Sequence, residues 1–157
     1  MKRILLLPLL FISALAFGQS DTSLVKFINP PSVSAPKGYS HAAVVDLGNC
    51  KMLIISGQVA LDNKGNLVGK GDFGKQAEQV FQNIRNVVES AGGKMDNVVK
   101  LGYFVTDVSQ IQTLRAIRDK FVNTKNPPAS TLVQVSKLFR DDILLEIEAT
   151  AIIPKKQ

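Results

Sequence analysis

The chain has 157 residues, of which 45% are hydrophobic and 20% are charged, and its formal net charge is +6. At this length we expect one domain that buries about two-thirds of the surface of its unfolded form, so it needs neither disulfide bonds nor a structural metal to fold. It contains one Cys and one His, which excludes Cys/His zinc sites, iron–sulfur clusters and disulfide frameworks. Metal chemistry and thiol chemistry are therefore the least expected functions.

Residues 1–18 have the pattern of a secretory signal peptide. Lys2 and Arg3 precede an apolar run at residues 4–17, which is shorter than the ~20 residues that span a bilayer, and small residues near its end place the cleavage site before Gln19. The alternative is a buried amphipathic first helix, which is disfavoured because the run is apolar on every side. We therefore expect an exported protein, periplasmic or secreted, with no membrane association after signal removal.

The charges of the remaining chain do not indicate a nucleic-acid partner. Without Lys2 and Arg3, 17 of the 19 basic residues remain against 13 acidic ones, and they are scattered instead of forming a basic stripe with interleaved aromatics. The single cysteine, Cys50, lies in a polar turn at residues 46–51 and has no internal partner. It is more typical of an incidental loop thiol than of a nucleophile or an intermolecular disulfide.

The first part of the remaining chain predicts an extension followed by a hairpin. Residues 19–36 are polar and interrupted by prolines, and residues 24–28 predict one short strand. The domain proper is expected over residues 37–157. Residues 39–45 and 52–59 are rich in Val, Ile, Leu and Ala, which predicts an antiparallel hairpin with a longish loop.

Two amphipathic helices are expected next. After an N-cap at Asp72, apolar residues recur every three or four positions until two glycines at residues 92–93 end the helix. A second helix begins at a cap formed by Asp107 or Ser109 and carries a similar stripe. It ends at residues 126–128, Asn-Pro-Pro, because a residue before proline is pushed out of helical geometry.

Three further strands are expected, at residues 97–106, 130–136 and 143–153. The resulting order, ββ, α, β, α, ββ, predicts an α+β fold with one sheet and both helices on one face. In the last strand one set of alternating side chains is apolar. The other set mixes apolar and charged residues: Leu144, Glu146, Glu148, Thr150 and Ile152. Because such a face suits neither water nor a monomer core, we expect it to meet another subunit.

Two pairs of residues are candidates for chemistry. Glu146 and Glu148 share a strand face, with Cα atoms about 7 Å apart, and two carboxylates in a partly dry site raise the pKa of at least one of them. The alternative is two carboxylates on a solvated strand. Ser56 and Gly57 close a strand, where Gly admits a ligand to the backbone and Ser supplies a hydroxyl, although a plain turn has the same composition.

Two other motifs do not indicate a catalytic or nucleotide-binding site. Tyr39 and His41 share a face of the first hairpin strand, and a lone His there is more typical of a hydrogen-bonded structural residue than of a catalyst. Three glycines within residues 65–71 do not follow a strand in the phosphate-loop pattern, so nucleotide binding is not expected.

Eight short motifs, in order and spacing, resemble those of one family. They are Tyr39-Ser40-His41-Ala42, Ile55-Ser56-Gly57-Gln58, Gln76 with Gln82-Asn83-Ile84, Ala91-Gly92, Val99-Lys100, Phe104-Val105-Thr106-Asp107, Pro128-Ala129-Ser130 and Glu146-Ile147-Glu148-Ala149. On this pattern the chain resembles the reactive intermediate deaminases, the RidA-like proteins also labelled endoribonuclease L-PSP.

The resemblance implies a chorismate-mutase-like single mixed sheet and a barrel-like homotrimer with small-molecule clefts between subunits. It implies hydrolysis of 2-imino or 2-enamino acids to 2-keto acids and ammonia, without a metal or organic cofactor. By the same resemblance Tyr39 lines the cleft, Ser56 and Gly57 contact the substrate, and Glu146 positions or activates water. Glu146 and Ser56 are thus the expected catalytic residues.

One departure from the family pattern concerns the substrate carboxylate. Deaminating members place an Arg after Pro-Ala, whose guanidinium binds that carboxylate bidentately. Here the aligned residue is Ser130, followed by Thr131, and these two are the expected substrate-binding residues. Lys125, Lys137 and Arg140 are nearby cations that can substitute.

Three functions follow as alternatives. The first is a RidA-like hydrolase of imines, enamines or related reactive molecules, with doubtful 2-imino-acid activity because Ser130 replaces the Arg. The second is a non-catalytic exported trimer that binds a small ligand or another protein. The third is the ribonuclease activity of the older label, which lacks a basic track. Retention of Glu146, Ser56 and Tyr39 favours the first, whereas loss of the Arg and export favour the second.

Overall fold

The computed structural model describes residues 23–155, and the proposed signal peptide at residues 1–18 lies outside that range. Within it the elements are β1 (Val25–Ile28), β2 (Ala42–Asp46), β3 (Cys50–Gln58), α1 (Phe73–Ser90), η1 (Met95–Asn97), β4 (Val98–Val105), η2 (Val108–Gln110), α2 (Ile111–Arg118), β5 (Ala129–Gln134) and β6 (Leu145–Pro154). No helix of this described part is long and apolar enough to cross a bilayer.

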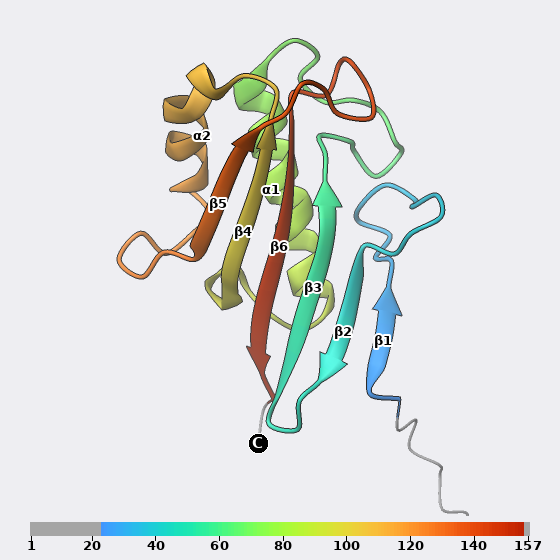
Figure 1. The fold of residues 1–157 in the computed structure, drawn as a ribbon. Coiled ribbons are helices and arrows are strands. Elements are labelled where there is room, and N and C mark those ends of the chain that lie inside the picture. Colours follow the sequence, from blue (N-terminus) through green and yellow to red (C-terminus); the bar gives the residue numbers. More distant parts are fainter. Residues whose placement is uncertain (1–22, 156–157) are drawn as a thin grey trace, which may run out of the picture.

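The strands form one mixed sheet in the order β1-β2-β3-β6-β4-β5 (Figure 1). Neighbouring strands are antiparallel except β4 and β5, which are parallel because α2 carries the chain back before β5 begins. The last strand, β6, inserts between β3 and β4. Both α-helices cover the same face of the sheet (Figure 1), so the expected α+β fold is confirmed.

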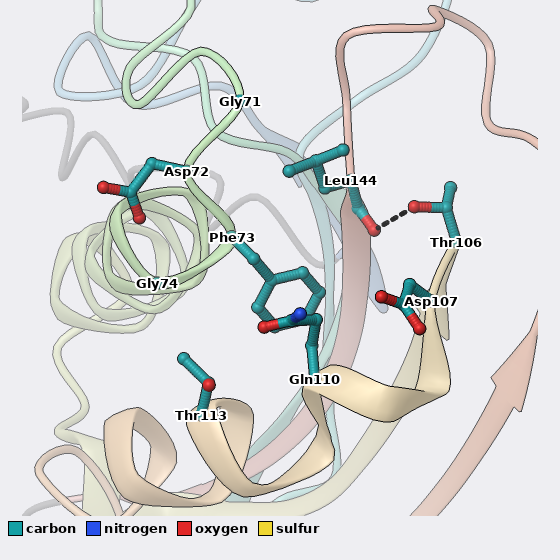
Figure 2. A pocket seen from close by; sticks show the side chains of 9 residues that line it. All are labelled: Gly71, Asp72, Phe73, Gly74, Thr106, Asp107, Gln110, Thr113 and Leu144. Carbon is teal, nitrogen blue, oxygen red and sulfur yellow. Dashed lines mark hydrogen bonds between the residues drawn. The ribbon is translucent and has the colours of Figure 1, made fainter.

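The ends of α1 agree with their sequence signals. Asp72 lies at its start (Figure 2). Oδ1 of Asp72 accepts a hydrogen bond of 3.0 Å from the N–H of Lys75, which satisfies one of the free donors of the first turn. At its end Gly92 has a φ of +85°, and the N–H of Gly93 donates to the carbonyl of Val88 at 3.0 Å. This left-handed ending favours glycine, and both predicted boundaries are confirmed.

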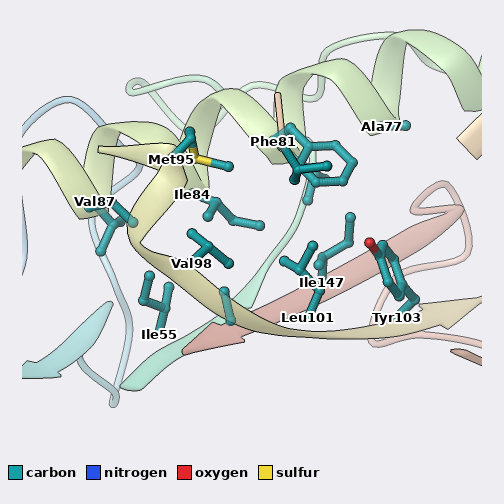
Figure 3. Packing of buried hydrophobic residues seen from close by; sticks show 14 of the residues in the cluster. Ile55, Ala77, Phe81, Ile84, Val87, Met95, Val98, Leu101, Tyr103 and Ile147 are labelled. Carbon is teal, nitrogen blue, oxygen red and sulfur yellow. The ribbon is translucent and has the colours of Figure 1, made fainter. Parts of the chain in front are cut away.

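The apolar stripe of α1 supplies the centre of the hydrophobic core. It points at the sheet and packs against side chains of β3, β4 and β6 (Figure 3). The core includes Ala77, Phe81, Ile84 and Val87 of the helix and Ile55, Leu101 and Ile147 of the strands. Full burial of one large aliphatic or aromatic side chain contributes about 1.5–3 kcal/mol, so this stripe anchors α1 to the strands that carry the site.

The second helix is shorter than predicted. Asp107 does form a cap, accepting from the N–H of Ser109 at 2.9 Å, but the turn it caps is η2, and α2 ends at Arg118. The N–H of Phe121 then bonds to the carbonyl of Arg118 at 2.8 Å, and the Asn123 side chain accepts from the N–H groups of two following residues. Such local bonds replace the regular backbone hydrogen bonds of the α-helix, so the helix ends before the prolines.

The first hairpin also differs from its prediction. β2 begins at Ala42 and β3 already begins at Cys50, so the connection is only residues 47–49. The longish loop is therefore wrong, and so is the placement of Cys50 in a turn. Cys50 lies opposite Pro154 of β6, and this long-range pairing extends β3 beyond its apolar run.

The sheet face opposite the helices, here called the open face, is not covered by either helix. Along β6 the odd-numbered residues from 145 to 153 are buried. Glu146 is half-buried and Glu148 is exposed, as the alternation predicts. Residues directly opposite each other on neighbouring strands share a face, and the register places Ile54 and Phe27 on the open face. Their side chains are 50% and 70% exposed.

Candidate functional site

A buried glutamine of α1 positions the start of β6. The Gln76 side chain is fully buried; its Nε2 donates to the carbonyls of Asp142 (2.8 Å) and Gly69 (3.2 Å), and its Oε1 accepts from the N–H of Leu144 (2.9 Å). Buried amides must find such partners, because leaving a backbone group unpaired is costly. The chain is thus held two residues before Glu146.

A buried asparagine two turns further along α1 does the same for the end of β3. Nδ2 of Asn83 donates to the carbonyls of Val59 (3.0 Å) and Leu61 (2.9 Å), and its Oδ1 accepts from Gln79 (2.8 Å). The sequence motif contains Gln76 and Asn83, but no local pattern states what they bind. Together they fix the two strand ends that meet at the candidate site.

Ser56 and Gly57 lie in a β-bulge. Because Ile55 is opposite Ala149 and Gln58 is opposite Ile147, these two residues face the single residue between them on β6, Glu148. A bulge of this kind bends the strand and redirects its side chains. It explains why a strand-end Ser-Gly pair stands beside the two glutamates.

Each of the two glutamates lies against a glycine of a neighbouring strand. A Cβ built on Gly57 overlaps Oε1 of Glu146 and lies 2.6 Å from its Cδ, and a Cβ on Gly102 lies 2.6 Å from Oε1 of Glu148. Any larger residue therefore forces the carboxylates to move. The predicted neighbourhood of Glu146 and Gly57 is present in the described structure.

The electrostatics of Glu146 differ from those of an ordinary surface carboxylate. Burial raises the pKa of Glu146, and the nearby charge of Glu148 raises it further. Burial likewise raises the pKa of Tyr39, with a second contribution from Glu146. Both groups are thus biased toward their protonated forms.

Ser56 joins the bulge to the segment that carries Tyr39. Its hydroxyl donates to the carbonyl of Ser40 at 2.7 Å, and its N–H donates to the carbonyl of His41 at 3.0 Å. The hydroxyl proton is thereby engaged, and no base lies within hydrogen-bond distance of it among the described residues. In this state Ser56 holds the backbone next to Tyr39 in place.

His41 is a structural residue, as predicted. The side chain is 2% exposed, and Nε2 lies 2.7 Å from the carbonyl oxygen of Ser34, which can only accept. Nε2 therefore carries the proton, and Nδ1 accepts from Nε2 of Gln58 at 3.3 Å. With both nitrogens engaged, His41 is not available as a base.

The two predicted substrate-binding residues of β5 lie on opposite faces of the sheet. Thr131 is opposite Gly102 on the open face and accepts a hydrogen bond of 2.8 Å from Nζ of Lys100. Ser130 is opposite Leu101, which is buried on the helix side. Since Glu146 lies on the open face, a single chain does not bring Ser130 and Glu146 to one small ligand.

Ser130 instead lines a small pocket between β5 and α2. This pocket, called here the α2–β5 pocket, has a volume of about 90 Å³, and its polar lining residues are Tyr103, Arg115, Arg118 and Ser130. None of the three cations considered from the sequence lines it, and Arg140 is already paired with Asp142 through two bonds of 2.9 and 2.7 Å. The sequence reasoning missed both helix arginines, although their i, i+3 spacing was visible.

A larger cavity of about 490 Å³ lies between the start of α1 and the segment before α2 (Figure 2). Its two carboxylates, Asp72 and Asp107, both accept backbone N–H groups as caps, and the Thr106 hydroxyl donates to the carbonyl of Leu144 (3.1 Å). None of the predicted site residues lines it. Across residues 23–155, no group of three or more His, Cys, Asp or Glu side chains is placed to hold a metal ion.

Comparison with known proteins gives one consistent result. Residues 30–153 match the family described as endoribonuclease L-PSP. A 2-iminobutanoate/2-iminopropanoate deaminase of Salmonella typhimurium is 36% identical over 126 residues, covering 79% of this chain and 92% of that protein. RidA from an Antarctic Psychrobacter superposes with a TM-score of 0.72 at 34% identity, covering 82% and 99%. Escherichia coli TdcF with bound serine superposes with a TM-score of 0.69 at 29% identity, covering 81% and 98%.

Proposed function

The chain belongs to the endoribonuclease L-PSP family, which includes the reactive intermediate deaminases, and on that basis we propose that it is a hydrolase that releases ammonia from imines or enamines. The observation that carries this proposal is the partly buried Glu146 carboxyl against Gly57. A 36% identical relative is named as an imine deaminase, and a structural relative holds serine, a small molecule that bears a carboxylate and an amine.

Glu146 suits both proton transfers of this reaction. Water adds to the carbon of the C=N bond, and the nitrogen then leaves as ammonia while a C=O bond forms, so the site must take a proton from water and deliver one to the nitrogen. A carboxyl group with a raised pKa serves as base in the first step and as acid in the second. Burial and Glu148 provide that raised pKa.

Gly57 and Tyr39 complete the reacting end of the site. The missing side chain at Gly57 leaves room for Glu146 against the backbone, where a substrate also approaches the main chain. Tyr39 is about half exposed, and its raised pKa keeps the hydroxyl protonated as a hydrogen-bond donor. Ser56 supports this end through its bond to Ser40.

The complete cleft forms between subunits of a homotrimer. Glu146 and Ser130 lie on opposite faces of one chain, so one ligand reaches both only when a second chain contributes. β5 is one of the two edge strands of the sheet, and the open face exposes Ile54 and Phe27. Packing the open faces inward buries this apolar surface and brings the edge strand of one chain to Glu146 of the next.

An ammonia-release assay tests the function. An amino-acid oxidase generates imines in situ, and the chain without residues 1–18 is added to a panel made from different amino acids, with spontaneous hydrolysis as the baseline. We expect ammonia to appear faster than the baseline for at least one small imine. No acceleration across the panel, with protein shown to be folded by circular dichroism, contradicts the proposal.

A second candidate function is binding without turnover. It is favoured by the Ser at position 130 where deaminating relatives are expected to carry an Arg, and it retains the same fold and trimer. The two candidates separate in the same assay, because a binding protein protects or retains an imine or its keto acid but does not accelerate ammonia release.

We further propose that the protein acts outside the cytoplasm, because residues 1–18 have the signal-peptide pattern. Fractionation of cells that express the full chain tests this, with the mature protein expected in the periplasm or medium and beginning at Gln19. Recovery of an uncleaved chain in the cytoplasm contradicts it.

A further inference from the structure

The α2–β5 pocket combines features of a small-anion site. It is lined by two guanidinium groups, a buried phenol and the Ser130 hydroxyl, with aliphatic walls that include Leu114 and Leu132. We propose that this pocket binds the substrate carboxylate, with Arg115 and Arg118 supplying the positive charge from the helix in place of an arginine on β5. The inference rests on the proposed function, which supplies the reacting end of the same molecule.

The Tyr103 hydroxyl is a second indication of a binding site, independent of the arginines. Tyr103 is 4% exposed, lies on the same side of the sheet as Leu101 and Ile147, and directs its hydroxyl toward the helix layer (Figure 3). That hydroxyl is buried and has no hydrogen-bond partner among the described residues. A buried donor without a partner is rare and costly in a folded protein, and an acceptor bound in the pocket removes that cost.

Tyr103 stays a donor at physiological pH. Burial raises its pKa to about 12, with Arg118 acting in the opposite direction and Asp119 in the same one. The neutral phenol therefore donates its proton in a hydrogen bond, and a carboxylate oxygen is the stronger kind of acceptor for it.

The two arginines differ in what they already bind. Nε and Nη2 of Arg118 donate to Oδ1 of Asp119 at 2.9 and 2.7 Å, which orients its guanidinium and compensates its charge. The Arg115 side chain is exposed, and its guanidinium makes no hydrogen bond or ion pair within residues 23–155. The pair thus leaves one positive charge uncompensated at the pocket, and the i, i+3 spacing keeps both on one side of α2.

The pocket size favours a carboxylate of a small acid. A volume of about 90 Å³ holds a carboxylate with a short carbon chain, and the apolar walls suit aliphatic carbons. Ser130 contributes here by being short, because a long side chain at that position enters the space that the helix guanidiniums reach. The C=N end of the same molecule then projects past the sheet edge toward Glu146 of the neighbouring subunit.

Binding of a keto acid and of its uncharged analogue tests the inference without requiring turnover. Calorimetric titrations of 2-oxobutanoate and butan-2-one, which differ in the carboxylate, are made with wild type and with Arg115→Gln, Tyr103→Phe and Lys125→Gln. Lys125 is the matched control, because it is an exposed cation outside the pocket. We expect wild type to bind the acid about tenfold or more tighter than the ketone.

The variants are expected to separate charge from structure. Arg115→Gln loses about tenfold in affinity for 2-oxobutanoate and nothing for butan-2-one, and Lys125→Gln changes neither. Tyr103→Phe weakens acid binding while its Tm is unchanged or higher, since the unpartnered hydroxyl is gone. A merely structural Tyr103 predicts a lower Tm and unchanged binding.

Two results overturn the inference: a wild type that does not distinguish acid from ketone, or an Arg115→Gln/Arg118→Gln double variant, folded by circular dichroism, that binds the acid like wild type. Failure of the proposed function is a different result. If wild type binds 2-oxobutanoate through Arg115 but releases no ammonia from imines, the pocket assignment stands and the hydrolase proposal fails.

Discussion

At the scale of single residues, the two glutamates of β6 are distinguished by their surroundings. Glu146 lies against Gly57, and burial together with the charge of Glu148 raises the pKa of Glu146. We expect Glu146→Gln to abolish ammonia release while leaving the protein folded, because the amide keeps the size of the side chain but not its proton transfer. Glu148→Gln is expected to cost far less. Equal turnover by wild type and Glu146→Gln contradicts the assignment.

The raised pKa of Glu146 also determines a pH dependence. A carboxyl group whose pKa is higher in the folded than in the unfolded state favours folding most below the unfolded pKa, and this contribution is lost as pH rises through the folded pKa. Glu146→Gln is therefore expected to raise Tm relative to wild type near neutral pH, with a smaller difference near pH 4. The base form of Glu146 increases over the same rise in pH, so turnover rises with it.

The glycines beneath the glutamates offer a matched pair of substitutions. Gly57→Ala displaces the Glu146 carboxylate and Gly102→Ala displaces that of Glu148, because each added Cβ meets the respective carboxylate. We expect Gly57→Ala to reduce turnover by about two orders of magnitude, similar to loss of a general base, and Gly102→Ala to retain most of it. Comparable losses in both variants indicate a general disturbance of the sheet instead.

Ser130 provides a residue-scale check on the carboxylate pocket. Ser130→Arg adds a third guanidinium beside Arg115 and Arg118 in a pocket of about 90 Å³, where like charges repel. We expect no gain in turnover of 2-imino acids in the ammonia assay, and a weaker affinity for 2-oxobutanoate. A tenfold gain shows instead that the wild-type site lacks a carboxylate partner.

At the scale of elements, α1 acts as the support for two strand ends. Gln76→Ala leaves the N–H of Leu144 and the carbonyl of Asp142 without their partner, and each unsatisfied buried group costs about 1–3 kcal/mol. Urea unfolding is expected to show a loss in that range or above it, with a parallel loss of turnover as β6 shifts. Gln112→Ala, at an exposed position of α2, is the control. Its free energy of unfolding is expected to lie within about 0.5 kcal/mol of that of wild type.

At the scale of the whole molecule, we expect the open face to contact other subunits of the proposed trimer. Phe27 and Ile54 expose large apolar side chains on it. Light scattering at micromolar concentration is expected to give the mass of a trimer. Ile54→Lys is expected to shift the mass toward the monomer and to lower turnover, whereas Leu47→Lys in the hairpin connection changes neither. A monomeric wild type contradicts the assembly.

Local patterns in the sequence were sufficient for most elements of this fold. The Asp72 cap, the glycine ending of α1 and the alternating faces of β6 were predicted. Each of them depends only on residues that are a few positions apart in the sequence. The resemblance of the motifs around Ser56, Gly57 and Glu146 likewise predicted the reacting end of the site, and that role stays a prediction. These features depend on neighbouring residues or on short motifs that occur in a fixed order along the sequence.

Tertiary structure alone decided the features that depend on distant partners. The position of β6 between β3 and β4 brings the Glu146 carboxylate against Gly57. The pairing of Cys50 with Pro154 extends β3. The parallel register of β5 on β4 places Leu132 opposite Tyr103, and Ser130 lines the same pocket as Tyr103, Arg115 and Arg118. No local rule predicts this cluster, because its members come from three elements whose approach is determined by packing of the whole core.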